Sequence, residues 1–144
     1  MQRYHQISQI ILEFQPKTVL EVGTHKAVRP REWYMFHKFD HYYGFDVFDD
    51  GDENLDKKEM NGKGRCSLEY AEEQLKDIPH TLYKGLTTET LPQFNERVDF
   101  AFIDGGHSVE TINHDFEIVS RILKPGGVII LDDFYTPEQE GFGS

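Results

Sequence analysis

The sequence predicts an α/β protein built on a doubly wound, mostly parallel sheet with helices on both faces. First, short β-branched or aromatic runs alternate with helix-like stretches along the 144 residues, which is typical of βαβ units. Second, acidic residues stand at, or within one residue of, the ends of four apolar runs: Glu21, Asp46, Asp104 and the pair Asp132 and Asp133. The carboxyl ends of parallel strands share one edge, where such folds bind ligands.

The first third of the chain contains two helix-like and two strand-like stretches. Helices are expected over 4–14, which Pro16 ends, and over 31–39, which Pro30 opens at a first-turn position. Strands are expected over 17–22 and 42–48. The apolar stripe of the first helix is Ile7, Ile10, Ile11 and Phe14, and the second helix carries Trp33, Phe36 and Phe39.

Residues 49–64 differ from the rest of the chain. They hold one Leu and one Met among charged residues and glycines, so they cannot pack an apolar face. We expect a mobile acidic surface loop there, which could act as a lid.

The length of the chain suits one domain over residues 1–144, and the hydrophobic content of 38% is enough for a core.

The middle of the chain predicts one helix, one strand and a short helical turn. Ser67 is a suitable N-cap for the helix, a strand is expected over 80–84, and Pro92 interrupts a short helix or turn over 87–94. The helix is expected to place four apolar residues on one side: Leu68, Ala71, Leu75 and Ile78.

The last third predicts strands over 98–104 and 128–131, separated by a helix that Ser108 caps. Residues 124–127, Lys-Pro-Gly-Gly, stop that helix, and residues 136–144 form an irregular tail. The expected inner face of the helix is Val109, Ile112, Phe116, Val119 and Leu123.

Charge and cysteine content exclude several classes of function. The 26 Asp and Glu outnumber the 15 Lys and Arg, and the net charge of −11 disfavours nucleic acid and membrane as partners. No apolar run is long enough for a membrane span, and the amino terminus is too polar for a signal peptide. Cys66 is the only cysteine, which excludes an internal disulfide and a Cys-rich zinc site and fits the cytoplasm.

The turn after the first strand reads Glu21-Val-Gly-Thr24. A dinucleotide site favours G-x-G-x-x-G here, whereas this chain keeps only Gly23 and has His25 and Ala27 further on. The sequence therefore disfavours a pyrophosphate-binding loop, and with it a nicotinamide-dependent oxidoreductase. A nucleoside without phosphates needs less close approach of the backbone.

Two further groups of acids are candidates for ligand binding. Asp46 ends the second strand, where an acid accepts hydrogen bonds from ribose hydroxyls; the alternative is a turn-forming residue before the acidic loop. Asp104, Asp132 and Asp133 offer hard oxygen ligands for Mg²⁺, Mn²⁺ or Ca²⁺; the alternative is a solvated acidic edge. His107 is a candidate general base, although a lone exposed histidine is more often incidental.

Five segments together resemble class I S-adenosylmethionine-dependent methyltransferases, above all the group of macrocin O-methyltransferase-like (TylF-type) sugar O-methyltransferases. They are TVLEVGT (18–24), YYGFDVFD (42–49), KGLTTETLP (84–92), FIDGGHS (102–108) and LKPGGVIILDDFY (123–135). The resemblance implies that Glu21, Gly23 and Thr24 hold the methionine part of the cofactor, and that Asp46 binds its ribose. It further implies that Val47 and Phe48 lie beside the adenine and that Asp104, Asp132 and Asp133 bind Mg²⁺.

The implied function is Mg²⁺-assisted O-methylation of a small hydroxylated molecule such as a sugar, with Asp104, which also belongs to the implied cofactor site, and His107 as the candidate catalytic residues. The resemblance implies a Rossmann-like methyltransferase fold whose last two strands have no counterpart after Tyr135. An open edge at the fifth strand suggests a homo-oligomer. The alternative is a catalytically inactive subunit of the same fold that binds cofactor or serves assembly.

Overall fold

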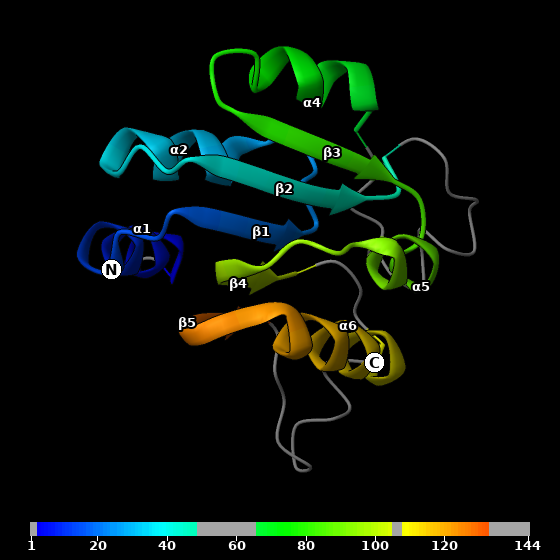
Figure 1. Cartoon of the computed structure of the whole chain (residues 1–144). Coiled ribbons are helices and arrows are strands. Elements are labelled where there is room, and N and C mark those ends of the chain that lie inside the picture. The colour runs from blue at the N-terminus through cyan, green and yellow to red at the C-terminus, as the bar shows by residue number, and fades with distance from the viewer. Residues whose placement is uncertain (1–2, 49–65, 105–107, 133–144) are drawn as a thin grey trace.

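The structure is a computed structural model, and it describes residues 3–48, 66–104 and 108–132 (Figure 1). The predicted loop over 49–64 and the predicted tail over 136–144 lie outside the described residues. Among the helices that the structure describes, none has the length and apolar character needed to cross a membrane.

In the part of the chain that the structure describes, one parallel sheet of five strands forms the centre of the fold. The strands are β1 (Thr18–Val22), β2 (His41–Asp46), β3 (His80–Lys84), β4 (Val98–Ile103) and β5 (Leu123–Leu131). Their order is β3-β2-β1-β4-β5, and every neighbouring pair is parallel (Figure 1). The chain therefore winds outward from β1 in both directions, which confirms the doubly wound α/β fold.

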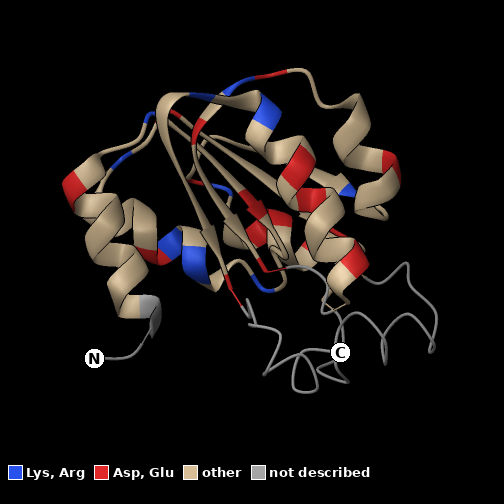
Figure 2. Ribbon diagram, turned by 90° about the horizontal axis from the view of Figure 1, so that it is seen from below, with Lys and Arg blue, Asp and Glu red and all other residues tan. Residues whose placement is uncertain are grey.

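Helices cover both sides of the sheet (Figure 2). On one face, a core cluster joins the sheet to α1 (Arg3–Phe14), to α2 (Val28–Phe36) and to Leu75 and Ile78, which follow α4 (Leu68–Gln74). On the other face, a second cluster joins it to the 3₁₀ helix η1 (Leu91–Gln93), which continues α5 (Thr87–Thr90), and to α6 (Val109–Ile122). Apolar residues at helical spacing drive this burial, because each helix removes one stripe from water.

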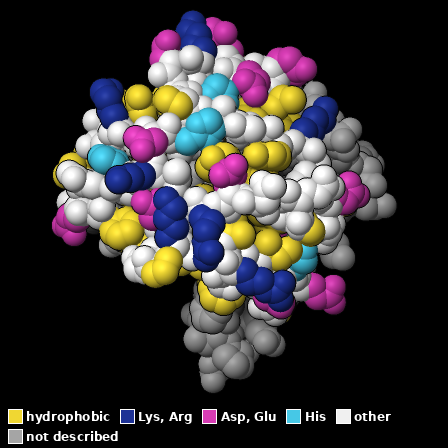
Figure 3. Space-filling view, viewed as in Figure 1, with side chains coloured by type: hydrophobic (Ala, Val, Ile, Leu, Met, Phe, Trp, Pro, Cys, Tyr) yellow, Lys and Arg dark blue, Asp and Glu magenta, His cyan; other side chains and the backbone are white. Residues whose placement is uncertain are grey.

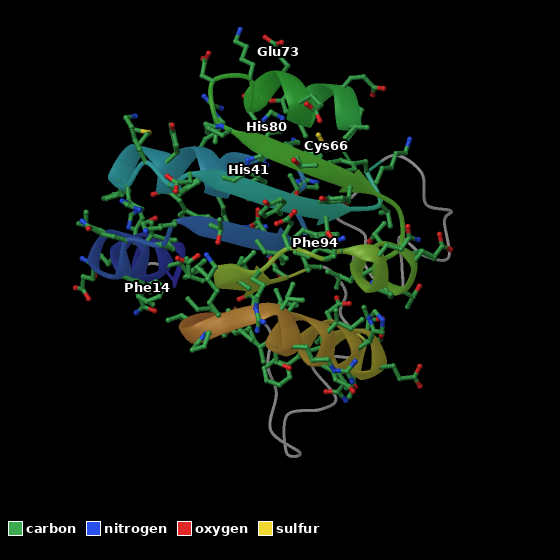
Figure 4. All side chains as sticks on the ribbon, in the orientation of Figure 1. Phe14, His41, Cys66, Glu73, His80 and Phe94 are labelled. Carbon is green, nitrogen blue, oxygen red and sulfur yellow. The ribbon has the colours of Figure 1, made fainter. Side chains whose placement is uncertain are left out.

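Aromatic side chains pack against one another in both cores. Trp33 of α2 is fully buried and meets Phe100 and Phe102 of β4 edge-to-face, with ring centroids 5.8 and 6.0 Å apart. On the opposite face, Phe94 (Figure 4) packs edge-to-face on Phe45, whose ring centroids lie 5.5 Å apart. These edge-to-face contacts add to the gain from burying the rings.

The predicted faces of two helices need correction. Phe14, at the end of α1, is 36% exposed (Figure 4), whereas Ile7 and Ile11 are buried as expected. Val109 and Phe116 of α6 are 51% and 43% exposed, whereas Val119 is buried as predicted and Asp115, which the prediction did not include, is also buried. The sequence pattern fits more than one face of α6, and its rotation is decided by what the sheet and η1 present to it.

Two element boundaries also differ from the prediction. Helix α2 begins at Val28 and ends at Phe36, so Phe39 is buried from the segment that follows it. Strand β5 begins at Leu123, because Leu123 already pairs with Val98 and residues 124–127 form an irregularity before pairing resumes. The N-caps are as predicted: the Ser67 hydroxyl accepts from the Tyr70 N–H, and Ser108 caps α6 in the same way.

Charged side chains of both signs lie among hydrophobic ones on the face shown in Figure 3. One acidic side chain, Asp99 of β4, anchors the entry to β1 at the amino end of the sheet. Its carboxylate accepts hydrogen bonds from the Lys17 N–H, the Thr18 N–H and the Thr18 hydroxyl. Partial burial opposes ionisation, but the hydrogen bonds from Thr18 and Lys17 outweigh it and lower the pKa of Asp99.

We expect Asp99→Ala to lower the free energy of unfolding by about 1–2 kcal/mol, because two backbone N–H groups lose a charged acceptor. Because the pKa of Asp99 is lower in the folded than in the unfolded protein, its ionised carboxylate stabilises the fold at pH values above the unfolded-state pKa of about 3.9. This stabilisation is lost as the pH falls through the folded-state pKa of Asp99. Urea unfolding from pH 7 down to pH 3 should therefore show the two proteins converging in stability at the acid end. A constant difference across that range would contradict the assignment.

Candidate functional site

The predicted acids that the structure describes lie toward one edge of the sheet. Glu21 is the fourth residue of β1, Asp46 ends β2, and Asp104 and Asp132 directly follow β4 and β5. Because all neighbouring strands are parallel, these positions come together at the carboxyl edge. Asp133 and His107 lie outside the described residues.

Glu21 is the most deeply buried of these acids, with no exposed surface. One carboxylate oxygen accepts a hydrogen bond from Arg29 Nε and the other from the Tyr42 hydroxyl. Burial raises the pKa of Glu21, while the charge of Arg29 and the hydrogen bonds from Tyr42 and Arg29 oppose the rise. Both oxygens of Glu21 are thus engaged by the protein itself.

Arg29, the second residue of α2, places a cation among the acids. Besides its bond to Glu21, its Nη2 donates to the Gly23 carbonyl at 2.8 Å and lies 3.7 Å from Asp104 Oδ2. Its guanidinium lies over the Phe102 ring, 5.2 Å from the centroid, and 18% of the side chain is exposed. Arg29 therefore links the ends of β1 and β4 and offsets the repulsion between Glu21 and Asp104.

Thr24 packs closely over β2. Its hydroxyl lies 3.0 Å from the Tyr42 hydroxyl, which extends the hydrogen-bonded group that starts at Glu21. A Cβ on Gly44 would lie 2.3 Å from Thr24 Oγ1 and 2.7 Å from a ring carbon of Tyr42. Only glycine leaves room for this contact, so Gly44 allows the loop after β1 to rest directly on β2.

Asp46 joins the loops that follow β1 and β2. One carboxylate oxygen accepts from the His25 N–H at 2.7 Å and the other from the Phe48 N–H at 2.9 Å, and the residue is 6% exposed. Each carboxylate oxygen has two acceptor sites, so these bonds leave Asp46 with capacity for a ligand hydroxyl. Phe48, which the resemblance places beside adenine, is fully buried, and Val47 is half-buried.

The loop after β1 keeps the left-handed backbone that glycines usually provide. The φ angles are 101° at Gly23, 51° at His25 and 62° at Ala27, and Phe48 in the neighbouring loop has 54°. A left-handed conformation costs an ordinary residue roughly 1–2 kcal/mol, which the Asp46 hydrogen bonds help to offset. The turn therefore forms with His25 and Ala27, and not glycine, at two of its left-handed positions.

Of the three aspartates predicted to bind a metal, the structure describes Asp104 and Asp132 but not Asp133. Ile103 pairs with Leu131, so Asp104 and Asp132 follow adjacent strands in the same register. Carboxylates suit a hard divalent ion, and in that respect the pair fits Mg²⁺. Within the described ranges, no group of three possible ligands is assembled, and Asp104 faces Arg29.

Three residues of this site were not found from the sequence: Arg29, Tyr42 and Gly44. Gly44 carried a usable signal, because a glycine inside a strand often marks a close backbone approach. Arg29 and Tyr42 carried none, since a polar contact between a helix and two strands depends on the packing of all three.

The order of the strands, the acids at their carboxyl ends and the tight turn after β1 define a Rossmann-like methyltransferase fold. A family model described as a methyltransferase domain matches residues 20–134. The chain belongs to this methyltransferase domain family. Its fold is that of class I S-adenosylmethionine-dependent methyltransferases.

Solved structures share this fold at low sequence identity. A candidate O-methyltransferase from Klebsiella pneumoniae is 18% identical, with a TM-score of 0.69 over 98% of this chain and 63% of its own. An O-methyltransferase from Bacillus cereus in complex with S-adenosylhomocysteine (SAH) is 17% identical, with a TM-score of 0.66 over 90% of this chain and 55% of its own.

A third structure is an O-methyltransferase of tomaymycin synthesis from Streptomyces achromogenes, in complex with S-adenosylmethionine. It is 15% identical, with a TM-score of 0.65 over 98% of this chain and 63% of its own. The present chain thus spans less than two thirds of each of these three proteins. No curated protein matches the sequence.

Proposed function

We propose that this protein is an S-adenosylmethionine-dependent O-methyltransferase that acts on a small hydroxylated molecule such as a sugar, with Mg²⁺ assistance. The cofactor proposal rests mainly on the position of Asp46. Its carboxylate accepts hydrogen bonds from the loops after β1 and β2 at the carboxyl edge of the sheet. This is the place where the fold binds a nucleoside, and an acid there suits a ribose. O-methyltransferases among proteins of the same fold support the reaction type.

The finer assignment is to the macrocin O-methyltransferase-like group of sugar O-methyltransferases. It rests on the segments YYGFDVFD and FIDGGHS and on the two aspartates after β5. A sugar as the methyl acceptor is part of the same proposal. Methyl transfer measured on a panel of hydroxylated sugars and phenols would distinguish sugar from aromatic specificity.

In the proposed reaction, a substrate hydroxyl oxygen attacks the methyl carbon of the cofactor in line with the sulfur. The O–CH₃ bond forms as the S–CH₃ bond breaks, SAH leaves, and the hydroxyl proton passes to a base, for which His107 is the candidate. The chain contributes orientation, with Asp46 on the ribose and the loop after β1 around the methionine part. Asp104, Asp132 and Asp133 would hold Mg²⁺, which when bound lowers the pKa of the hydroxyl.

Isothermal titration of the folded protein with SAH and S-adenosylmethionine tests the cofactor proposal. We expect saturable binding of both nucleosides and none of NADH, because the loop lacks the further glycines of a pyrophosphate site. A folded sample that gives no heat with either nucleoside at millimolar concentration would rule the proposal out.

Asp132→Ala tests the metal proposal. We expect loss of at least about 90% of the Mg²⁺-dependent methyl transfer and weaker Mn²⁺ binding by electron paramagnetic resonance, with SAH affinity changed less than about threefold. Asp40→Ala is the matched control, because Asp40 is exposed just before β2, at the other edge of the sheet. Equal rates in the wild type and the Asp132 variant would remove Asp132 from the mechanism, and full activity in the presence of EDTA would remove the metal.

A catalytically inactive assembly subunit is the second candidate. Within the described residues, β5 pairs only with β4, so its other edge presents unpaired backbone groups that a second copy of the chain could meet. Light scattering distinguishes a homo-oligomer from a monomer. SAH binding without methyl transfer to any acceptor, in an assembled protein, would favour this candidate over the enzyme.

A further inference from the structure

The ion pair between Glu21 and Arg29 is built into the fold beside the candidate cofactor site. Glu21 has no exposed surface, and both of its carboxylate oxygens accept hydrogen bonds from the protein. A carboxylate enclosed in this way is poorly placed to receive a ligand. Its role is instead to fix the guanidinium of Arg29, which turns a long flexible side chain into a rigid one.

Arg29 reaches the surface where the strands end. Its side chain is 18% exposed, and its Nη2 lies between the Gly23 carbonyl and Asp104 Oδ2. Helix α2, in which Arg29 is the second residue, contributes the partial positive charge of its amino end. Arg29 therefore places a guanidinium at the end of β1, close to the carboxylates of Glu21 and Asp104.

We propose that Arg29, fixed by Glu21, binds the α-carboxylate of the methionine part of the cofactor. This inference rests on the proposed function, because it takes the ligand to be S-adenosylmethionine. The amino-acid end of that ligand carries one carboxylate and one ammonium group. Arg29 matches the carboxylate, because a guanidinium donates charge-assisted hydrogen bonds to carboxylates.

The proposal changes the role that the resemblance implies for Glu21. Glu21 becomes a positioning residue for Arg29 and does not contact the ligand. Glu21 is then required for binding only because it positions Arg29.

Ligands that differ only at the amino-acid end test the proposal on the unaltered protein. We would titrate it calorimetrically with SAH, with decarboxylated SAH (S-adenosyl-3-thiopropylamine) and with 5′-methylthioadenosine, which lacks the amino-acid end. We expect SAH to bind at least about tenfold more tightly than its decarboxylated analogue. Similar affinities for the two would overturn the proposal without affecting the cofactor assignment, whereas no binding of any of the three would overturn both.

A double variant locates the effect at Arg29. Glu21→Gln with Arg29→Met removes both charges of the pair, so no buried carboxylate is left alone. We expect this variant to bind SAH and decarboxylated SAH within about threefold of each other and to keep its affinity for 5′-methylthioadenosine. Tenfold discrimination that persists in the double variant would assign the carboxylate to another group and overturn the proposal.

Arg31→Met is the matched control on the same helix. Arg31 is exposed and its Nη1 donates to Gln74 Oε1 on α4, away from the carboxyl edge. We expect it to keep the full discrimination between SAH and its decarboxylated analogue. Arg29→Lys keeps the charge but loses the planar guanidinium, and partial discrimination there would show that the guanidinium contributes beyond its charge.

Discussion

Replacing Glu21 with alanine is expected to lower the free energy of unfolding by about 3–5 kcal/mol, the range found when one partner of a buried ion pair is removed. The variant leaves the guanidinium of Arg29 without its main partner and the Tyr42 hydroxyl without its acceptor. Chemical unfolding in urea, extrapolated to water, measures the loss.

Two variants serve as controls for this prediction. Glu21→Gln keeps an acceptor of the same size, so we expect a smaller loss than with alanine. Glu73, on the outer side of α4 (Figure 4), pairs with Lys76 at 2.9 Å, and both side chains are more than 60% exposed. An exposed pair contributes little, so Glu73→Ala should leave stability nearly unchanged. Equal losses for Glu21→Ala and Glu73→Ala would mean that the Glu21 pair does not stabilise the fold.

Asp46→Ala is expected to weaken SAH binding by at least about 100-fold. The variant removes the proposed acceptor of the ribose hydroxyls, and it also releases the N–H groups of His25 and Phe48. Both residues have left-handed backbones, which relax once the carboxylate no longer holds them. The loss of the ribose contacts and the relaxation of the two loops both weaken binding. Each lost hydrogen bond to a charged acceptor contributes about 1.5–3 kcal/mol.

The two effects of Asp46→Ala can be separated with a modified ligand. If Asp46 binds the ribose, the 2′-deoxy analogue of SAH should bind the wild type more weakly than SAH does, and the variant should bind both alike. Asp40→Ala, which alters an exposed residue just before β2, should change neither affinity. Unchanged SAH affinity in Asp46→Ala would exclude the residue from the cofactor site.

The fold was largely predictable because its elements are local patterns. Ser67 and Ser108 cap their helices as the sequence suggests, and the strands fall where β-branched and aromatic runs predict them. The predicted inner face of α6 was right at Val119 and wrong at Val109 and Phe116. All three fit the same periodicity, and the position of the sheet decides which of them is covered. The early start of β5 was missed because residues 124–127 interrupt the pattern without ending the pairing.

The candidate site was predictable in its acids and not in their partners. An acid after a strand can be found from the sequence, and parallel winding then brings Glu21, Asp46 and Asp104 to one edge. Whether such an acid faces a ligand depends on neighbours that are distant in the chain. Glu21 meets Tyr42 across 21 residues, and that contact makes it a structural anchor.

The sequence by itself determined the architecture and the edge at which the site lies, since hydrophobic periodicity fixes the elements and the winding of a parallel sheet fixes where its strands end. Only the tertiary structure decided how the charges at that edge are balanced. Arg29 enters from α2, Tyr42 from β2 and Gly44 leaves space for Thr24, and these positions exist only after the helix and both strands have packed. Electrostatic and steric contacts depend on distances of a few ångströms, which residue order alone does not set.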